Sequence, residues 1–113
     1  MSAQFPCPSC GFLVFAEPPG SYDICPICGW EDDGVQLEAP GYAGGANHDS
    51  LYEHQQRVAL RLAPPGVGLL KGYRRAPDWR PAAPEEATTE IPEPRLAWTD
   101  PAIYYWRRSR DAI

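Results

Sequence analysis

The first half of this 113-residue chain contains no lysine or arginine. Residues 57–113 hold all ten basic side chains against seven acidic ones, whereas the acidic side chains of residues 1–56 are Glu17, Asp23, Glu31, Asp32, Asp33, Glu38, Asp49 and Glu53. The two halves carry −8 and +3, which sum to the formal net charge of −5. Because a negative half repels phosphate backbones, the charge pattern disfavours nucleic-acid binding there and favours a basic protein partner.

The N-terminus also lacks the pattern of a signal peptide. The first twenty residues carry no positive charge, and their longest apolar run, residues 12–16, is too short for a signal sequence or a membrane span. We therefore expect a cytoplasmic protein without membrane association. Thiols stay reduced in that compartment, so paired cysteines indicate metal ligands before disulfides.

Long periodic segments are scarce, because fourteen prolines and ten glycines interrupt all but one of them. A chain this short and irregular buries little apolar surface, so a metal or disulfide is expected to stabilise it. Its four cysteines occur as two close pairs.

The cysteines form two matching motifs, Cys7-Pro-Ser-Cys10-Gly and Cys25-Pro-Ile-Cys28-Gly. Two intervening residues let both sulfurs of a turn reach one ion, and the following glycine permits the left-handed backbone that such a turn needs. Four thiolates suit one zinc ion in a closed, structural site. A mononuclear iron site, as in rubredoxin-like electron carriers, and a disulfide or redox dithiol are the alternatives.

The expected fold is a small metal-stabilised α+β domain. A zinc-ribbon-like β-hairpin is predicted, with residues 12–15 and 22–24 as strands joined by the turn at residues 18–21 and a cysteine turn at one end of each strand. A helix is predicted at about 51–62, with Ser50 and Glu53 as its capping box and Leu51, Val58 and Leu62 on one face together with Gln55. We expect residues 1–63 to form the metal-binding domain.

Residues 64–113 are predicted to be an irregular extension rich in proline and aromatic residues. Segments 67–70 and 95–98 have the composition of short strands. The aromatic side chains are too many for a disordered tail.

Three segments closely resemble the bacterial cysteine-rich CPCC domain family. They are residues 5–12, residues 20–36, and Gly44-Gly-Ala-Asn47 with Ser50-Leu51, so the resemblance covers about residues 5–60. The family has a further cysteine where this chain has Ser9. The resemblance implies a small bacterial metal-binding domain, and some members look like immunity proteins encoded beside secreted toxins.

Several other side chains are candidates for function. Glu31, Asp32 and Asp33 are interpreted as an exposed acidic loop that a basic partner could contact, since no nucleophile or histidine accompanies them as an acid/base site would require. Trp98, Tyr104, Tyr105 and Trp106 are predicted as interface anchors, with core packing as the alternative. His48 and His54 are expected to be exposed or capping, and Trp30 to shield the metal site.

We therefore expect a protein that is not an enzyme. The predicted function is a non-catalytic zinc-binding module that binds another protein, with one Zn²⁺ per chain held by Cys7, Cys10, Cys25 and Cys28. The sharper hypothesis is an immunity protein that neutralises a basic toxin. A rubredoxin-like electron carrier and a nucleic-acid-associated zinc ribbon are the alternatives.

Overall fold

Each cysteine turn lies at the tip of its own small hairpin in a computed structural model that describes residues 4–108. Strands β1 (Phe5–Pro6) and β2 (Leu13–Phe15) pair antiparallel around the first turn, with Phe5 opposite Phe15 and Pro6 opposite Leu13. Around the second turn, Ile24 forms an isolated antiparallel bridge with Glu31.

The predicted pairing of residues 12–15 with residues 22–24 is therefore wrong. Residues 13–15 pair instead with residues 5–6 across the first turn. Residues 22–24 face residues 31–32, with Tyr22 N–H donating to the Asp32 carbonyl at 3.0 Å and Asp32 N–H donating to the Asp23 carbonyl at 2.9 Å. The physical reason is loop closure: a four-residue cysteine turn brings its own flanking residues together at a smaller entropy cost than the longer loop between the motifs.

The sequence patterns did not predict the short helix α1 (Gly34–Glu38). Asp33 begins it, because its Oδ1 accepts hydrogen bonds from the backbone N–H groups of Val35 at 2.8 Å and Gln36 at 3.3 Å. An aspartate at this N-terminal position satisfies backbone donors that have no partner within the helix.

The predicted helix at residues 51–62 is confirmed as one continuous helical segment. It consists of α2 (Leu51–His54), the π-helical segment η1 (Gln55–Ala59) and α3 (Leu60–Leu62). The capping box is also confirmed, with Glu53 N–H donating to Ser50 Oγ at 3.1 Å and Ser50 N–H donating to Glu53 Oε1 at 2.9 Å.

The buried face of this helix differs from the predicted one. The buried positions are Leu51, Gln55 and Ala59, whereas Leu62 is 53% exposed. The hydrogen bonds of a π-helical segment span one residue more than those of an α-helix, which widens the turn and moves the buried position from Val58 to Ala59. The predicted periodicity assumed an uninterrupted α-helix.

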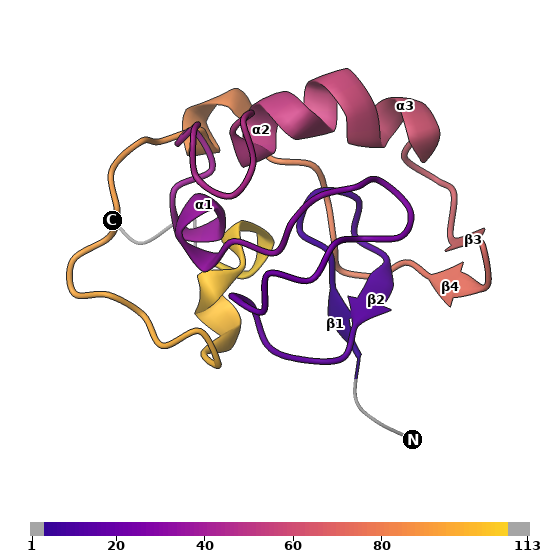
Figure 1. Cartoon of the computed structure of the whole chain (residues 1–113), viewed down its shortest axis with the longest axis horizontal. Coiled ribbons are helices and arrows are strands. Elements are labelled where there is room, and N and C mark those ends of the chain that lie inside the picture. The colour runs from indigo at the N-terminus through magenta and orange to yellow at the C-terminus, as the bar shows by residue number, and fades with distance from the viewer. Residues whose placement is uncertain (1–3, 109–113) are drawn as a thin grey trace.

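Residues 64–108, the C-terminal arm, contain two strands and three 3₁₀ turns. These elements are β3 (Leu69–Leu70), β4 (Tyr73–Arg74), η2 (Pro84–Glu86), η3 (Pro101–Ile103) and η4 (Tyr105–Arg107). Strands β3 and β4 pair antiparallel, whereas residues 95–98 form no strand. Figure 1 shows the helix α2–α3 along one side of the molecule, with the β3–β4 hairpin beyond the end of α3.

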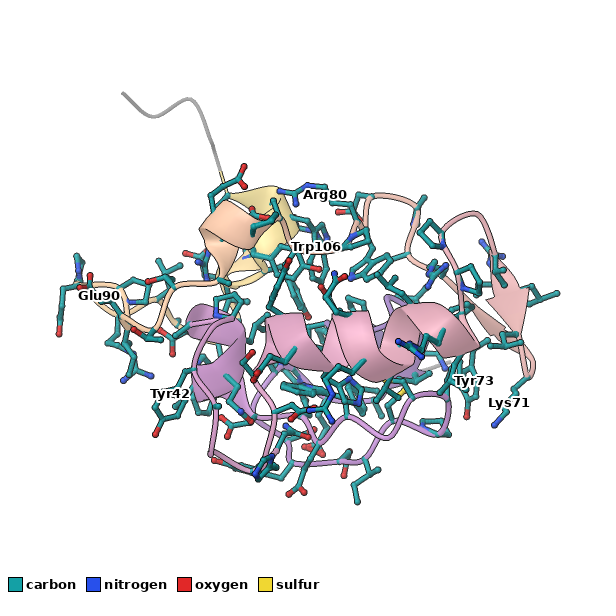
Figure 2. All side chains as sticks on the ribbon, turned by 90° about the horizontal axis from the view of Figure 1, so that it is seen from above. Tyr42, Lys71, Tyr73, Arg80, Glu90 and Trp106 are labelled. Atoms are coloured by element: carbon teal, nitrogen blue, oxygen red, sulfur yellow. The ribbon has the colours of Figure 1, made fainter. Side chains whose placement is uncertain are left out.

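The arm and the cysteine turns share one hydrophobic core. Phe12, Trp30 and Leu51 are buried together with Ile103 and Tyr105 from the arm. Figure 2 shows Trp106 beside the helix, whereas Lys71 and Glu90 project outward at opposite ends of the molecule. Within residues 4–108, no helix is both long and apolar enough to cross a membrane.

Candidate metal centre

The structure brings the four predicted ligand cysteines into one buried cluster. The sulfur atoms of Cys7, Cys10, Cys25 and Cys28 all lie within 4.8 Å of one another. The Cys7 and Cys28 sulfurs are 3.7 Å apart, and so are those of Cys10 and Cys25, so each close pair joins the two turns. All four side chains are buried.

These distances fit a tetrahedral metal site. Four sulfurs at about 2.3 Å from a central ion lie about 3.8 Å from one another, which follows from tetrahedral geometry. A disulfide requires a separation of about 2.05 Å, so neither close pair is bonded. The donor set and its spacing therefore suit one tetrahedrally coordinated metal ion.

The backbone of each turn follows the expected course. Gly11 and Gly29, which follow the second cysteine of each motif, have φ values of +83° and +81°. In the second turn, the N–H groups of Ile27 and Cys28 donate to the Cys25 sulfur at 3.4 and 3.5 Å. Such donors stabilise a thiolate and orient it toward the ion.

The electrostatics of the cluster also favour a bound cation. Burial raises the pKa of Cys7, and hydrogen bonding with Cys10 raises the pKa of Cys28 while it lowers the pKa of Cys25. Four negative charges in a buried cluster repel one another, so full deprotonation of the four thiols is unfavourable unless a cation is present. A bound divalent cation would offset this charge and favour the deprotonated cysteines.

The C-terminal arm holds the backbone of the first cysteine turn. Trp79 Nε1–H donates to the Pro8 carbonyl at 3.0 Å, and Arg75 Nε–H donates to the Cys10 carbonyl at 2.8 Å. From the helix, Gln55 Nε2–H also donates to the Pro8 carbonyl at 3.0 Å. The sequence patterns did not predict these contacts, since partners separated by 47 to 71 residues leave no local signal.

Ser9, which lies between Pro8 and Cys10 in the first cysteine turn, contacts His54. Its Oγ lies 2.5 Å from His54 Nδ1, and the His54 ring centroid is 5.2 Å from that of Trp30. His54 is half-buried, so the prediction of an exposed or capping role is wrong for this histidine, and burial lowers its pKa. His48, by contrast, is exposed as predicted. Trp30 is fully buried beside the turns.

The predicted acidic loop is largely internal, which corrects its interpretation as an exposed surface. Asp32 is buried and accepts a 2.7 Å hydrogen bond from Ser21 Oγ, and burial raises its pKa. Asp33 is buried as the cap of α1 and also accepts from Ala46 N–H at 2.9 Å. Glu31 is half-buried. The two aspartate side chains lie inside the protein because they accept hydrogen bonds from backbone N–H groups of adjacent turns.

The four predicted aromatic anchors also point largely into the protein. Tyr104, Tyr105 and Trp106 are buried in the core. Trp98 is half-buried, and its Nε1–H donates to Glu38 Oε1 at 3.1 Å. Of the two interpretations, the structure shows core packing, because the arm folds back on the domain.

One comparison with known proteins identifies a family for the N-terminal half of the chain. Residues 5–60 match the family described as cysteine-rich CPCC. A search of curated proteins found no match. The matched segment contains all four cysteines, Ser9 and most of the helix, whereas the arm lies beyond it.

Proposed function

We propose that this chain, whose residues 5–60 belong to the cysteine-rich CPCC family, holds one zinc ion at a structural site and acts by binding another protein, without catalysing a reaction. The observation that carries the proposal is the set of four buried cysteine sulfurs at tetrahedral spacing. A bound zinc ion would cross-link the two turns. Its four coordination positions would all be filled by the protein, which leaves none for water or substrate.

Zinc is proposed over iron, although four thiolates can hold either metal. Fourteen residues separate Cys10 from Cys25, and this spacing is short for a rubredoxin-like carrier. Substitution of one ligand by serine tests the site, because it removes a soft donor while it keeps a similar size. Cys28→Ser is expected to abolish stoichiometric zinc binding and the folded state that depends on it.

A surface beside the second cysteine turn supports the protein-binding part of the proposal. Tyr22, Asp23 and Ile24 are all exposed, and Ile24 is 64% accessible to solvent. We name residues 22–24 the Tyr22–Ile24 edge. Two exposed apolar side chains flank a negative charge there, and Glu31 lies across the bridge from Ile24. This edge suits a basic partner with an apolar centre better than the buried aspartates do.

The partner that we propose is a toxin with a basic surface, which the protein would neutralise as an immunity protein. The support is the family resemblance together with the absence of lysine and arginine from residues 1–56. A direct test is co-purification with the product of the neighbouring gene, followed by a toxicity assay.

A matched pair of variants locates the binding surface. Ile24→Arg places a positive charge on the Tyr22–Ile24 edge, whereas Leu69→Arg makes the same change at an equally exposed residue in β3. We expect Ile24→Arg to weaken partner binding at least about tenfold and Leu69→Arg to leave it unchanged. Equal effects of the two changes would remove this surface from the proposal, and failure of the wild type to bind or protect would remove the immunity role. Neither result would affect the metal site.

A further inference from the structure

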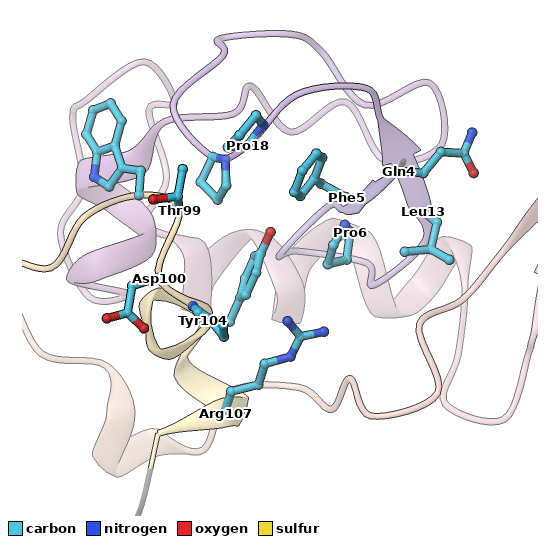
Figure 3. A pocket seen from close by; sticks show the side chains of 12 residues that line it. Gln4, Phe5, Pro6, Leu13, Pro18, Thr99, Asp100, Tyr104 and Arg107 are labelled. Atoms are coloured by element: carbon cyan, nitrogen blue, oxygen red, sulfur yellow. The ribbon is translucent and has the colours of Figure 1, made fainter. Parts of the chain in front are cut away.

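A cavity of about 400 Å³ lies between the first hairpin and the C-terminal arm. Figure 3 shows it from close by. The rings of Phe5, Pro6, Pro18, Trp98, Pro101 and Tyr104 form much of its wall. Small-molecule sites usually occupy about 300–1,000 Å³, are mostly apolar and contain few polar groups. The cavity has these properties and lies away from the cysteine cluster, whose four residues are not part of its wall.

One polar group of the cavity lacks a partner. Tyr104 is 4% exposed, and its hydroxyl makes no hydrogen bond among the residues that the structure describes. In Figure 3 this hydroxyl points between Phe5, Pro6 and Pro18. Buried hydroxyl groups are nearly always hydrogen-bonded, because leaving one without a partner costs free energy. Tyr104 is one of the residues that line the cavity, so a ligand bound there is the candidate partner for its hydroxyl.

We propose that this cavity binds a small, uncharged aromatic molecule whose oxygen atom accepts a hydrogen bond from the Tyr104 hydroxyl. Proline and aromatic rings favour a flat, apolar ligand, which can stack on or pack edge-to-face against them. The apolar wall thus favours an aromatic ring in the ligand, and the Tyr104 hydroxyl favours a ligand oxygen that accepts its hydrogen bond.

The charged groups around Tyr104 are of both signs, which favours an uncharged ligand over an anion or a cation. Burial raises the pKa of Tyr104 well above its usual value, so its hydroxyl keeps its proton and can donate it. The Arg107 guanidinium lies 5.0 Å from the centre of the Tyr104 ring, and Asp100 is also part of the cavity wall. Arg107 is already paired with Asp78 at 2.7 Å, so it does not offer an unshared charge to a carboxylate ligand.

Two probes that differ only at the accepting atom test the proposal. Acetophenone carries a carbonyl oxygen, and α-methylstyrene has a methylene group in its place. The metal-loaded full chain is titrated with each probe and followed by two-dimensional ¹H–¹⁵N NMR. For acetophenone we expect saturable shifts at the amides of Leu13 and Thr99, two further wall residues, with a dissociation constant on the order of 1 mM.

The decisive quantity is the preference, defined as the dissociation constant of α-methylstyrene divided by that of acetophenone. Tyr104→Phe removes the hydroxyl and keeps the ring, so we expect the preference to fall about 3- to 10-fold. Tyr42→Phe makes the same change at a tyrosine outside the cavity wall and should leave the preference unchanged. An equal preference in wild type and Tyr104→Phe would overturn the role of the hydroxyl.

A second variant tests the location independently of Tyr104. Leu13 lies in the cavity wall and is half-buried, so Leu13→Trp should fill much of the space. We expect this change to weaken acetophenone binding at least about tenfold. Unchanged binding in Leu13→Trp, or no saturable shift at the wall residues of the wild type up to the solubility of acetophenone, would overturn the proposal.

Discussion

Gln55→Ala is the substitution that best tests how the arm and the metal centre depend on each other. Gln55 is fully buried in the middle of the helix. Its side-chain amide donates to the Pro8 carbonyl at 3.0 Å and to the Tyr105 hydroxyl at 2.8 Å, and its Oε1 accepts from Ala82 N–H at 2.9 Å. One side chain thus joins the first cysteine turn to two separate parts of the arm.

The expected loss of stability depends on which buried polar groups still have a hydrogen-bond partner in the Gln55→Ala variant. The Pro8 carbonyl still accepts from Trp79, and the Tyr105 hydroxyl still donates to the Arg80 carbonyl at 2.6 Å. Only the Ala82 N–H is left buried without a partner, which costs about 1–3 kcal/mol. The lost packing of the amide adds about 1 kcal/mol, so we expect Gln55→Ala to lower the free energy of unfolding by about 3 kcal/mol.

The assay is urea unfolding of the metal-loaded protein at a fixed metal concentration. With a slope of about 1.5 kcal/mol per molar urea, the midpoint should fall by about 2 M. Gln56→Ala is the matched control, because the neighbouring glutamine is exposed and its removal should change stability by less than about 0.5 kcal/mol. If Gln55→Ala and Gln56→Ala had the same small effect, the proposed coupling between the arm and the cysteine turn would be refuted.

Two further predictions concern the turns and the buried carboxylate. Gly11 and Gly29 share a positive φ, but a Cβ on Gly11 would overlap the Trp79 ring whereas one on Gly29 would meet nothing within 4 Å. Thermal or urea unfolding should therefore show Gly11→Ala about 2 kcal/mol less stable than Gly29→Ala, and equal losses would contradict the docking of Trp79. Burial would raise the pKa of Glu38, but hydrogen bonds from Arg95 and Trp98 outweigh it and hold the pKa below its usual range. The Glu38 carboxylate thus adds stability above its unfolded pKa of about 4.3, and this contribution is lost as the pH falls through the lower folded value. The stability difference between wild type and Glu38→Gln should therefore shrink in acid, and a constant difference in urea midpoint from pH 7 downward would contradict this linkage.

The features that sequence patterns predicted correctly are local ones. A cysteine turn, a capping box and a helix depend on residues within a few positions of one another, so spacing and residue type suffice. The clustering of the two cysteine turns also agrees with the structure, since two equivalent turns around one ion have to meet. The family resemblance extended this reasoning to residues 5–60, and the comparison confirmed it.

The features that were missed depend on contacts and backbone irregularities that residue type and periodicity do not indicate. The pattern around Asp32 and Asp33 indicated an exposed acidic loop, but these carboxylates are buried because nearby backbone and hydroxyl donors bind them. The π-helical segment moved the buried face of the helix, and periodicity analysis assumes that no such insertion occurs. The pair between buried Glu38 and exposed Arg95 spans 57 residues, so neither residue indicated the other in the sequence.

The most direct test of the central claim is elemental analysis of the purified, tag-free protein, expressed as metal per chain. The predicted result is one zinc per chain, which native mass spectrometry detects on the folded protein. The Cys28→Ser variant is expected to lose this zinc. One iron per chain with a visible charge-transfer colour would keep the four-cysteine centre but contradict its assignment to zinc. Folded protein without bound metal would contradict the centre itself.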